Sequence, residues 1–392
     1  MVVVFTVVIA NLGNSIVAPV IPQIRSQFGS SAAEVGLVAS GFGLGRLLMD
    51  LPAGYVADRI SITKLFVVGI LLSAAAATAG GFSTSLQQIV FFRTAMGTGC
   101  ALMTTVALVL LVNMAGPAQR GRVLAYYSSS LLLGQALSPL IGGSLATLFD
   151  WRATFFFCAL TPFATLPLAI VATSKVTNVR PLDRAEGNHH IQHSSPAKAG
   201  SKKNAPTNWL ALAVVYFSTF ANFFNRQAMR QSLLPLYGAL VLAMDPGAIG
   251  AILTAGSLLT ILVTLPCGSI ADRIGRKPLL IPGLMTLCLG NLTLFVGQNQ
   301  LSFVISTLLI SMGVLANSMQ GGLVADLLPE RFVGRGIGMY RFIGDLGMLL
   351  GPIALGTVVD GSGFPAALIV GTIVVLLAVL AVALFVPRRP AA

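Results

Sequence analysis

Long apolar segments follow one another along almost the whole of this 392-residue chain. Each is roughly 20 residues long, the length that an α-helix needs to cross the ~30 Å hydrocarbon core of a bilayer. Only 9% of the residues are charged, against about a quarter in soluble domains. The segments do not alternate apolar and polar residues, as transmembrane β-strands would. The chain is therefore predicted to be an all-α integral membrane protein with about twelve transmembrane helices.

The predicted helices form two groups on either side of one polar stretch. That stretch, residues 175–207, contains all three histidines and six Lys or Arg residues, with almost no apolar periodicity. We predict an N-terminal six-helix bundle (1–174), a cytoplasmic linker (175–207) and a C-terminal six-helix bundle (208–392). The individual spans are predicted near residues 1–24, 33–57, 64–84, 86–112, 122–147, 152–174, 208–232, 247–271, 278–298, 300–326, 333–359 and 364–387.

Lys and Arg residues are distributed unequally between the two sets of connecting segments. One set, with the linker, carries 17 of the 24, whereas the opposite set carries only Arg25 and Arg152. Basic loops remain in the cytoplasm, so both termini and the linker are predicted to be cytoplasmic. This topology accounts for the net charge of +12. We expect no nucleic-acid partner, because the basic residues do not gather with aromatic residues on one face.

A repeat relates the two halves of the sequence. Gly121 and Arg122 recur 213 residues later as Gly334 and Arg335. A second group recurs after 214 residues: Pro52, Gly54, Asp58 and Arg59 reappear as Pro266, Gly268, Asp272 and Arg273. Several groups of residues that recur after nearly the same number of positions indicate a structural unit that is used twice.

Two loop segments carry the most specific motif. GYVADRI (54–60) and GSIADRIGRKP (268–278) resemble the loop signature of the major facilitator superfamily. The resemblance implies two pseudo-symmetric six-helix bundles and a conformational gate at these loops. It assigns the gate to Gly54, Asp58, Arg59, Gly268, Asp272, Arg273 and Arg276. Asp326, at the end of a later span, is expected to contact Arg273.

Further motifs narrow the resemblance to the twelve-helix drug:proton antiporters. LGNSIVAPVIP (12–22) is similar to their first-helix motif, and GQALSPLIGG (134–143) is similar to their fifth-helix motif, with Ser138 in place of a glycine. Arg93 resembles the fourth-helix arginine, which that family associates with proton transfer. The resemblance assigns the helix-five motif to Gly134, Pro139, Gly142 and Gly143.

Charged residues inside the predicted spans indicate function, because an ionisable group in a bilayer is costly. Arg46 and Asp50 lie four residues apart in one span, as do Arg341 and Asp345 in another. In the family's arrangement these spans face each other. The crosswise pairs Asp50 with Arg341 and Arg46 with Asp345 have similar estimated depths, about 10 to 12 Å and about 16 to 18 Å. Two interpretations are open. The crosswise pairs form an inter-half network for proton coupling, or Arg46 neutralises Asp50 and Arg341 neutralises Asp345 within one helix each.

The family's cavity is lined by its first, fourth, seventh and tenth helices, which in this chain carry an unusual number of polar residues. These are the candidate substrate-binding residues: Asn11, Asn14, Arg93, Asn222, Asn225, Arg226, Arg230, Asn317 and Gln320. An arginine-rich cavity favours an anionic or zwitterionic substrate, or one with a carbonyl-rich face. Arg230 has a second interpretation, as a snorkelling residue near the outer surface.

The resemblance implies a secondary active transporter, and we expect proton-coupled efflux of small amphipathic molecules. The alternative is uptake or exchange of an anionic metabolite or nutrient on the same fold. An enzyme is not expected, since neither a GxxxxGK[ST] nor an HExxH motif occurs. We expect a monomer in a bacterial inner membrane whose partners are the lipid bilayer, protons and a small-molecule substrate. No cofactor or metal is expected, and the four cysteines are interpreted as packing residues.

Overall fold

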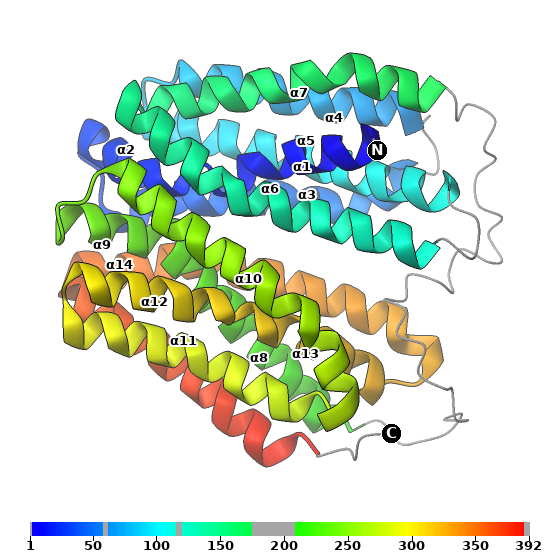
Figure 1. Cartoon of the computed structure of the whole chain (residues 1–392), viewed down its shortest axis with the longest axis vertical. Coiled ribbons are helices and arrows are strands. Elements are labelled where there is room, and N and C mark those ends of the chain that lie inside the picture. The colour runs from blue at the N-terminus through cyan, green and yellow to red at the C-terminus, as the bar shows by residue number, and fades with distance from the viewer. Residues whose placement is uncertain (1, 58–61, 115–119, 175–207, 388–392) are drawn as a thin grey trace. The chain divides into compact units, whose positions relative to one another are not determined.

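The computed structural model describes residues 2–57, 62–114, 120–174 and 208–387, and every regular element in these ranges is helical. The predicted all-α fold is confirmed. Figure 1 shows the helices, whose bounds in the first half are α1 (Val2–Ser15), η1 (Ala18–Val20), α2 (Ile21–Phe28), α3 (Ala32–Ala57), α4 (Ile62–Gly81), α5 (Leu86–Met114), α6 (Arg120–Leu148) and α7 (Trp151–Ser174). The second half contains α8 (Trp209–Ala228), η3 (Met229–Leu233), α9 (Leu234–Leu240), α10 (Pro246–Ile274), α11 (Lys277–Gly297), α12 (Gln300–Met312), α13 (Val314–Leu327) and α14 (Glu330–Phe385).

Each predicted span contains one of these helices or a closely spaced series of them. Among the described residues, nine helical stretches are long and apolar enough to cross a membrane. The 56-residue α14 is counted once, although it covers two predicted spans. Gly363 divides it, with a φ of 82° that lies outside the helical region and that glycine adopts without steric cost. The helices are thus consistent with the predicted count of about twelve spans.

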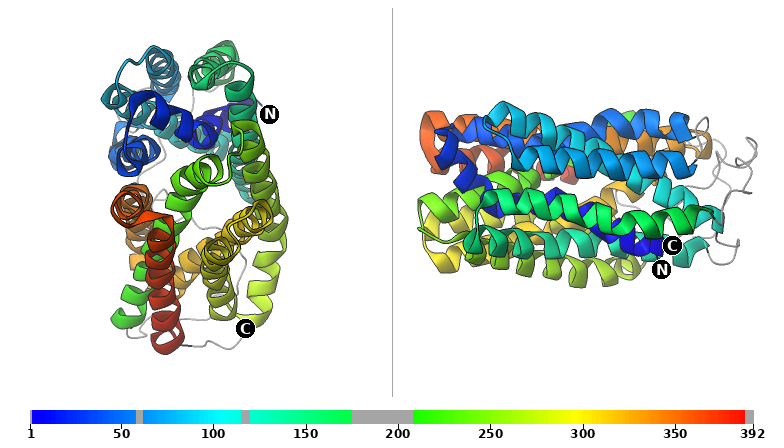
Figure 2. Two further views of the ribbon diagram at one scale, coloured as in Figure 1. Left: turned by 90° about the vertical axis from the view of Figure 1, so that its left-hand side faces the viewer. Right: turned by 90° about the horizontal axis from the view of Figure 1, so that it is seen from above.

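The described residues form two compact units. The first contains α1 to α7 together with residues 243–254, which include the start of α10, and the second contains α8, η3, α9, the rest of α10 and α11 to α14. Figures 1 and 2 show that the helices of each unit run alongside one another as a bundle. The predicted division at 175–207 lies outside the described residues, so the predicted domain boundaries stay predictions.

Glycines allow helices within each unit to pack backbone to backbone. A Cβ atom on Gly97 of α5 would collide with the carbonyl group of Phe42 in α3. In the second unit, a Cβ on Gly351 of α14 would collide in the same way with the carbonyl group of Phe224 in α8. Small residues at such contacts are typical of membrane helix pairs, because they let the backbones approach closely.

Three predicted spans are interrupted rather than continuous. The first changes from α1 through the short η1 to α2, with Pro19 inside η1. The seventh contains η3, a turn of π-helix between α8 and α9. The tenth is divided at Gly313, between α12 and α13. Interrupted helices in a membrane protein leave backbone groups that need other partners, and π turns often occur at functional sites.

Candidate functional site

Arg93 is the most deeply buried charged residue among those of the first unit whose side chains the structure describes, with 1% of its surface exposed. It lies on α5, and its guanidinium donates hydrogen bonds to the carbonyl oxygens of Gly13 at 2.6 Å and Asn14 at 3.2 Å. Its Nε also contacts the carbonyl oxygen of Val38 at 3.5 Å, and the group lies 4.9 Å from the centre of the Phe42 ring. Arg93 therefore links α5 to both α1 and α3.

The interruption of the first span explains this position. Because α1 ends at Ser15, the last carbonyl groups of that helix have no partner within the helix and carry its partial negative charge. Arg93 meets this need with hydrogen bonds and a positive charge. Two further predicted residues are buried nearby: Asn11 donates to the carbonyl oxygen of Val7 at 3.1 Å, while Asn14 contributes its backbone carbonyl to Arg93. Contact of these residues with substrate stays a prediction.

A cluster of amide side chains lies inside the second unit. Asn222 of α8 donates to Asn317 Oδ1 at 2.5 Å and to Gln320 Oε1 at 3.2 Å, both on α13. Gln320 in turn donates to Ser218 Oγ at 3.1 Å, and Tyr340 of α14 donates to the carbonyl oxygen of Asn317 at 3.0 Å. We call Ser218, Asn222, Asn317, Gln320 and Tyr340 the amide cluster. It joins α8, α13 and α14 in an otherwise apolar interior, and it includes three of the predicted substrate residues.

Asn225 belongs to a different group. Its Oδ1 accepts a hydrogen bond of 3.0 Å from Asn291 of α11, and both side chains are fully buried. A Cβ on Gly371 of α14 would collide with the Asn225 oxygen, so the pair is tightly enclosed. The structure therefore places Asn225 among α11 and α14 instead of beside Asn222. A buried amide pair of this kind fixes helix positions, since each side chain satisfies part of the other's hydrogen-bonding capacity.

Arg226 and Arg230 lie one helical turn apart but have different neighbours. Arg226 lies over the Phe223 ring at 5.4 Å and interacts electrostatically with Tyr340. Arg230 lies in the π turn η3, and its Nη2 donates to Ser257 Oγ of α10 at 2.5 Å. The two guanidinium groups also interact with each other electrostatically. The second unit thus concentrates positive charge beside the amide cluster.

The gate loops are only partly described. Asp58 and Arg59 lie outside the described residues; Gly54 lies in α3, and Gly268 lies in α10 with Asp272, whose side chain is not described. Arg273 is exposed. Asp326 was expected to contact Arg273, but this prediction is wrong: its Oδ2 lies 3.0 Å from Nη1 of Arg276.

The packing around Arg276 explains the different partner. A Cβ on Gly322 would lie only 2.5 Å from the Arg276 guanidinium, so this side chain rests directly on the α13 backbone. Asp326 follows Gly322 by four residues, which places it on the same face of α13. Gly322 therefore directs Arg276 toward Asp326, a relation that the loop motif alone did not indicate.

The helix-five motif lies on α6 and packs within the first unit. Cβ atoms on Gly134 and Gly142 would collide with the carbonyl groups of Val8 and Ile16 in the first span. Pro139 and Gly143 approach residues 246–250 in the same close manner. Ser138, which replaces a glycine of the resembled motif, donates to the carbonyl oxygen of Leu12 at 2.8 Å. The substitution thus adds a hydrogen bond to a tight helix contact.

The four residues of the predicted inter-half network belong to separate units. Arg46 and Asp50 lie on α3, where the side chain of Asp50 is not described. Arg341 is exposed and Asp345 partly buried on α14, and both interact electrostatically with Tyr340. The crosswise pairing and the pairing within each helix both stay predictions.

Sequence reasoning missed several polar residues that the structure places at these contacts. Ser218 and Tyr340 complete the amide cluster, Ser257 binds Arg230, and Asn291 binds Asn225. A spacing signal was available for Ser218, which lies four residues before Asn222 and so on the same helix face. Among the described residues no group of His, Cys, Asp and Glu could hold a metal ion.

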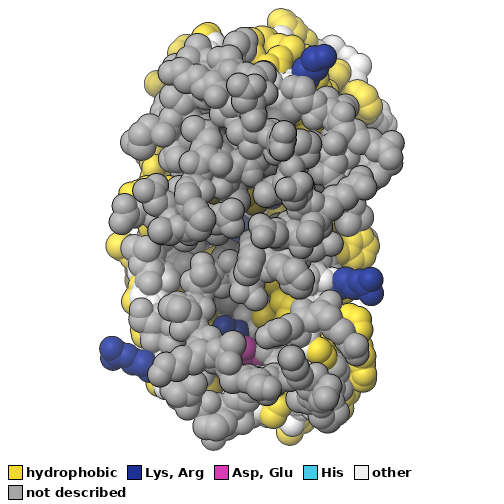
Figure 3. All heavy atoms as spheres, turned by 90° about the vertical axis from the view of Figure 1, so that its right-hand side faces the viewer, with side chains coloured by type: hydrophobic (Ala, Val, Ile, Leu, Met, Phe, Trp, Pro, Cys, Tyr) yellow, Lys and Arg dark blue, Asp and Glu magenta, His cyan; other side chains and the backbone are white. Residues whose placement is uncertain are grey.

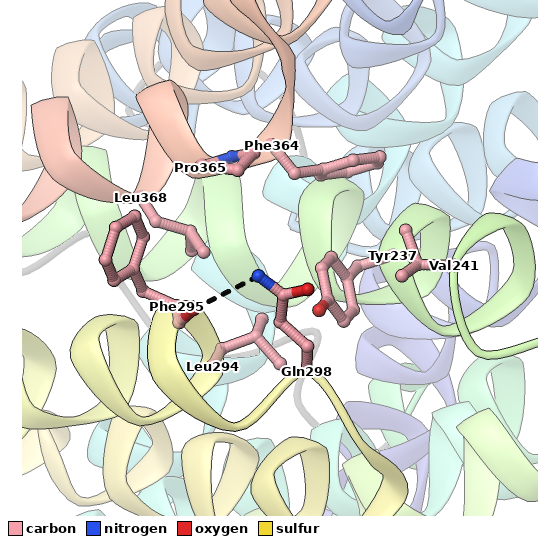
Figure 4. A pocket seen from close by; sticks show the side chains of 8 residues that line it. All are labelled: Tyr237, Val241, Leu294, Phe295, Gln298, Phe364, Pro365 and Leu368. Carbon is pink, nitrogen blue, oxygen red and sulfur yellow. Dashed lines mark hydrogen bonds between the residues drawn. The ribbon is translucent and has the colours of Figure 1, made fainter.

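A small cavity lies apart from all the predicted site residues. Figure 4 shows Tyr237, Gln298 and Phe364 around it, together with Val241, Leu294, Phe295, Pro365 and Leu368. Its walls are mainly apolar, and the Gln298 amide donates to the carbonyl oxygen of Phe295 at 3.4 Å. It belongs to the region of the second unit where α9, α11 and the bend in α14 meet.

Comparison with protein families gives one match that covers the chain. The model of the Major Facilitator Superfamily matches residues 3–226 and again 215–392. Multidrug efflux protein YfmO of Bacillus subtilis is 32% identical over 172 residues, which are 43% of this chain and 41% of that protein. Multidrug export protein EmrB of Escherichia coli is 30% identical over 37% of this chain and 28% of its own length. This chain therefore aligns with less than half of these relatives' length.

Longer matches come at lower identity. The uncharacterised MFS-type transporter MJ1560 of Methanocaldococcus jannaschii is 21% identical over 90% of this chain and 89% of its own. A bacterial homologue of the human lysosomal transporter Spinster, solved in an inward-facing and occupied conformation, has a TM-score of 0.77 at 15% identity, covering 98% of this chain and 95% of that one. The human organic anion transporter MFSD10 has a TM-score of 0.66 at 16% identity, and the match covers 97% of this chain and 98% of that one. The family resemblance is thereby confirmed, and the chain belongs to the Major Facilitator Superfamily, a family of membrane transporters.

Proposed function

We propose that this protein is a proton-coupled exporter of small amphipathic molecules that works by alternating access. The amide cluster is the observation that carries the proposal. Its amide groups can donate and accept hydrogen bonds, while Phe223 of α8 and the apolar helices around the cluster supply apolar contacts. A site with these properties suits molecules that combine apolar surface with a few polar groups. The relatives named for multidrug efflux support the same substrate range.

Alternating access is supported by the interrupted helices. The breaks at η1, η3 and Gly313 lie in the first, seventh and tenth predicted spans, which the family resemblance assigns to the substrate cavity. In membrane transporters, substrate sites are often formed by discontinuous helices, and one bundle moves against the other around the site. We assign the gate to the two loop motifs and the proton coupling to Arg46, Asp50, Arg341 and Asp345.

We further propose a monomer in a bacterial inner membrane, with both termini in the cytoplasm. The unequal distribution of Lys and Arg supports this orientation. On the face drawn in Figure 3, most of the described charged side chains in view are Lys or Arg, as that orientation requires for a cytoplasmic surface.

Transport in proteoliposomes tests the proposal. The full-length protein is reconstituted, a pH gradient is imposed, and accumulation of fluorescent amphipathic compounds is followed. We expect accumulation that requires the gradient and is lost in Asp345→Asn. Asp360→Asn is the matched control, because it changes the same residue type on α14 outside the proposed network. Accumulation that is indifferent to the gradient, or equal loss in both variants, would contradict proton coupling through Asp345.

One observation favours a second candidate function, the uptake or exchange of an anionic metabolite. The amide cluster is accompanied by Arg226 and Arg230, and α8, η3 and α9 contain no acidic residue. The same proteoliposomes distinguish the two candidates. Exchange of organic anions without any imposed pH gradient would favour the second function over the first.

A further inference from the structure

Arg226 is only partly buried, and it differs from Arg93 and Arg276 in lacking an acceptor among the described residues. It lies on α8, nine residues before Pro235 and so roughly 14 Å along the helix from it. Its Nε is completely buried without a hydrogen-bond partner. Within the part of the chain that the structure describes, its guanidinium forms no hydrogen bond or ion pair. It lies over the Phe223 ring and interacts electrostatically with Tyr340 and with the neighbouring cation Arg230.

Other arginines in the protein show how such a group is normally accommodated. Arg93 donates to three backbone carbonyl groups, and Arg276 is paired with Asp326. A completely buried donor without a partner, such as the Nε of Arg226, is unfavourable, because water has been removed and nothing replaces it. The position of Arg226 within a span therefore indicates a partner that comes from outside the described residues.

The surroundings of Arg226 indicate the chemistry of that partner. Arg226 and the Tyr340 hydroxyl interact electrostatically, yet no hydrogen bond joins them in the described structure. A planar guanidinium binds a carboxylate through two parallel hydrogen bonds. The single Tyr340 O–H can join the same anion when it leaves the carbonyl oxygen of Asn317. The Phe223 ring below the guanidinium offers an apolar surface to the part of a ligand next to its acid group.

We propose that Arg226 binds the carboxylate of an amphipathic organic acid, with Phe223 against the adjoining apolar part and the Tyr340 hydroxyl near the same carboxylate. The proposal deepens the transport function given above, on which it rests for its biological meaning, by naming the substrate class. It assigns recognition of the acid group mainly to Arg226, whereas the Asn and Gln side chains of the amide cluster recognise uncharged polar groups.

An internal counter-ion is the competing explanation. Asp345 is the acidic residue that shares an electrostatic interaction with Tyr340, so a rearranged Asp345 would be the protein's own partner for Arg226. In that case removal of the Arg226 charge would affect all ligands alike. Under our proposal it affects acids selectively, and a matched pair of ligands separates the two explanations.

The test compares 1-pyrenebutyrate with its methyl ester, which share one apolar body and differ in the acid group. Binding to the full-length protein in uncharged detergent is followed by the fluorescence of the pyrene. We expect the wild type to bind the acid at least tenfold more tightly than the ester. Arg226→Gln should weaken binding of the acid by about tenfold to a hundredfold, the range for a lost charged hydrogen-bonding partner, and leave the ester within about twofold.

Two further variants make the result specific. Arg226→Lys keeps the charge but not the bidentate geometry and should retain part of the preference for the acid. Arg152→Gln is the matched control, because Arg152 also lies over an aromatic ring, Trp151 at 4.8 Å, but donates to the carbonyl oxygen of Gly81. It should leave the affinities for both probes unchanged. Thermal unfolding of each variant verifies that it is folded.

The possible outcomes separate this inference from the proposed function. Failure of the wild type to bind the acid, equal affinity for the two probes, or equal weakening of both by Arg226→Gln would overturn the role of Arg226. Acid binding that depends on Arg226 without gradient-driven transport would support the inference and contradict the exporter function. Gradient-driven transport of the ester and the acid at equal rates, unaffected by Arg226→Gln, would support the exporter function and contradict the role of Arg226.

Discussion

The two units of this protein each place an arginine within a helix bundle, and the two residues have opposite surroundings. Arg93 of the first unit donates to the carbonyl groups of Gly13, Asn14 and Val38. Arg226 of the second unit has an aromatic ring beneath it and no hydrogen-bond acceptor among the described residues. Both residues look alike in sequence, as arginines within predicted apolar spans. The comparison shows that the supply of acceptors, and not burial alone, separates a structural cation from one prepared for a ligand.

The largest expected effect is on the stability of the first unit. Arg93→Gln removes the donors for the carbonyl groups at the buried C-terminal end of α1, and we expect it to lower the free energy of unfolding by about 3 kcal/mol. Arg226→Gln should change that free energy by less than about 1 kcal/mol, since no hydrogen bond is lost. Unfolding monitored by cysteine reactivity in detergent gives both values, because all four cysteines are buried. Equal destabilisation by the two variants would break the comparison.

The next largest effect concerns close helix packing in the first unit. A Cβ on Gly142 would collide with the backbone of Ile16, so Gly142→Ala should destabilise the protein by about 1 to 3 kcal/mol. Gly338 of α14 has no atom within 4 Å of the corresponding position. Gly338→Ala is therefore the control, and it should be neutral or slightly stabilising, because alanine favours helix more than glycine does. A tolerated Gly142→Ala would show that α1 and α6 can separate freely.

Two amides, Asn225 of α8 and Asn317 of α13, sharpen the comparison within the second unit. Asn225→Ala should lower the free energy of unfolding by about 1 to 2 kcal/mol, because it leaves the buried Asn291 amide without its partner. Asn317→Ala changes a partly exposed residue, and we expect a larger effect on substrate affinity than on stability. Unfolding and ligand binding are measured on both variants. A loss of ligand affinity confined to Asn225→Ala would show that the enclosed pair, instead of the amide cluster, contacts the substrate.

The smallest expected effect is at the partly exposed pair of Arg276 and Asp326. The side chains are 29% and 38% exposed, so a double-mutant cycle with Arg276→Gln and Asp326→Asn should give a coupling of about 0.5 kcal/mol. Arg273→Gln is the control and should show no coupling with Asp326→Asn. Coupling to Arg273 in place of Arg276 would restore the partner that the sequence motif suggested.

Apolar segments, basic loops and the repeat predicted the helical membrane fold, because each depends on properties of whole segments. The breaks at Ser15, in η3 and at Gly313 were not predicted. Proline and glycine are common in continuous membrane helices, where neighbouring helices satisfy the freed backbone groups. Sequence alone therefore could not indicate where a helix is interrupted.

The candidate site was predictable in residue type but only partly in its pairing. Asn222, Asn317 and Gln320 were selected as polar residues in apolar spans, and the structure brings them together. Asn225 was selected for the same reason but pairs with Asn291 of α11, a partner that depends on how α8 packs against α11 and not on the sequence of α8 alone. Arg276 takes the place of Arg273 because Gly322 leaves room for its side chain.

Arg226 lacks an acceptor and is proposed to bind an acidic ligand, whereas Arg93 is already hydrogen-bonded to carbonyl groups of the protein. The most direct test is the rise in unfolding temperature that saturating 1-pyrenebutyrate produces in the wild type, Arg226→Gln and Arg93→Lys. A ligand stabilises the state to which it binds, so we predict a clear rise in the wild type and in Arg93→Lys, and a clearly smaller rise in Arg226→Gln at the same ligand concentration. The same rise in Arg226→Gln, or no rise in the wild type, would contradict the account.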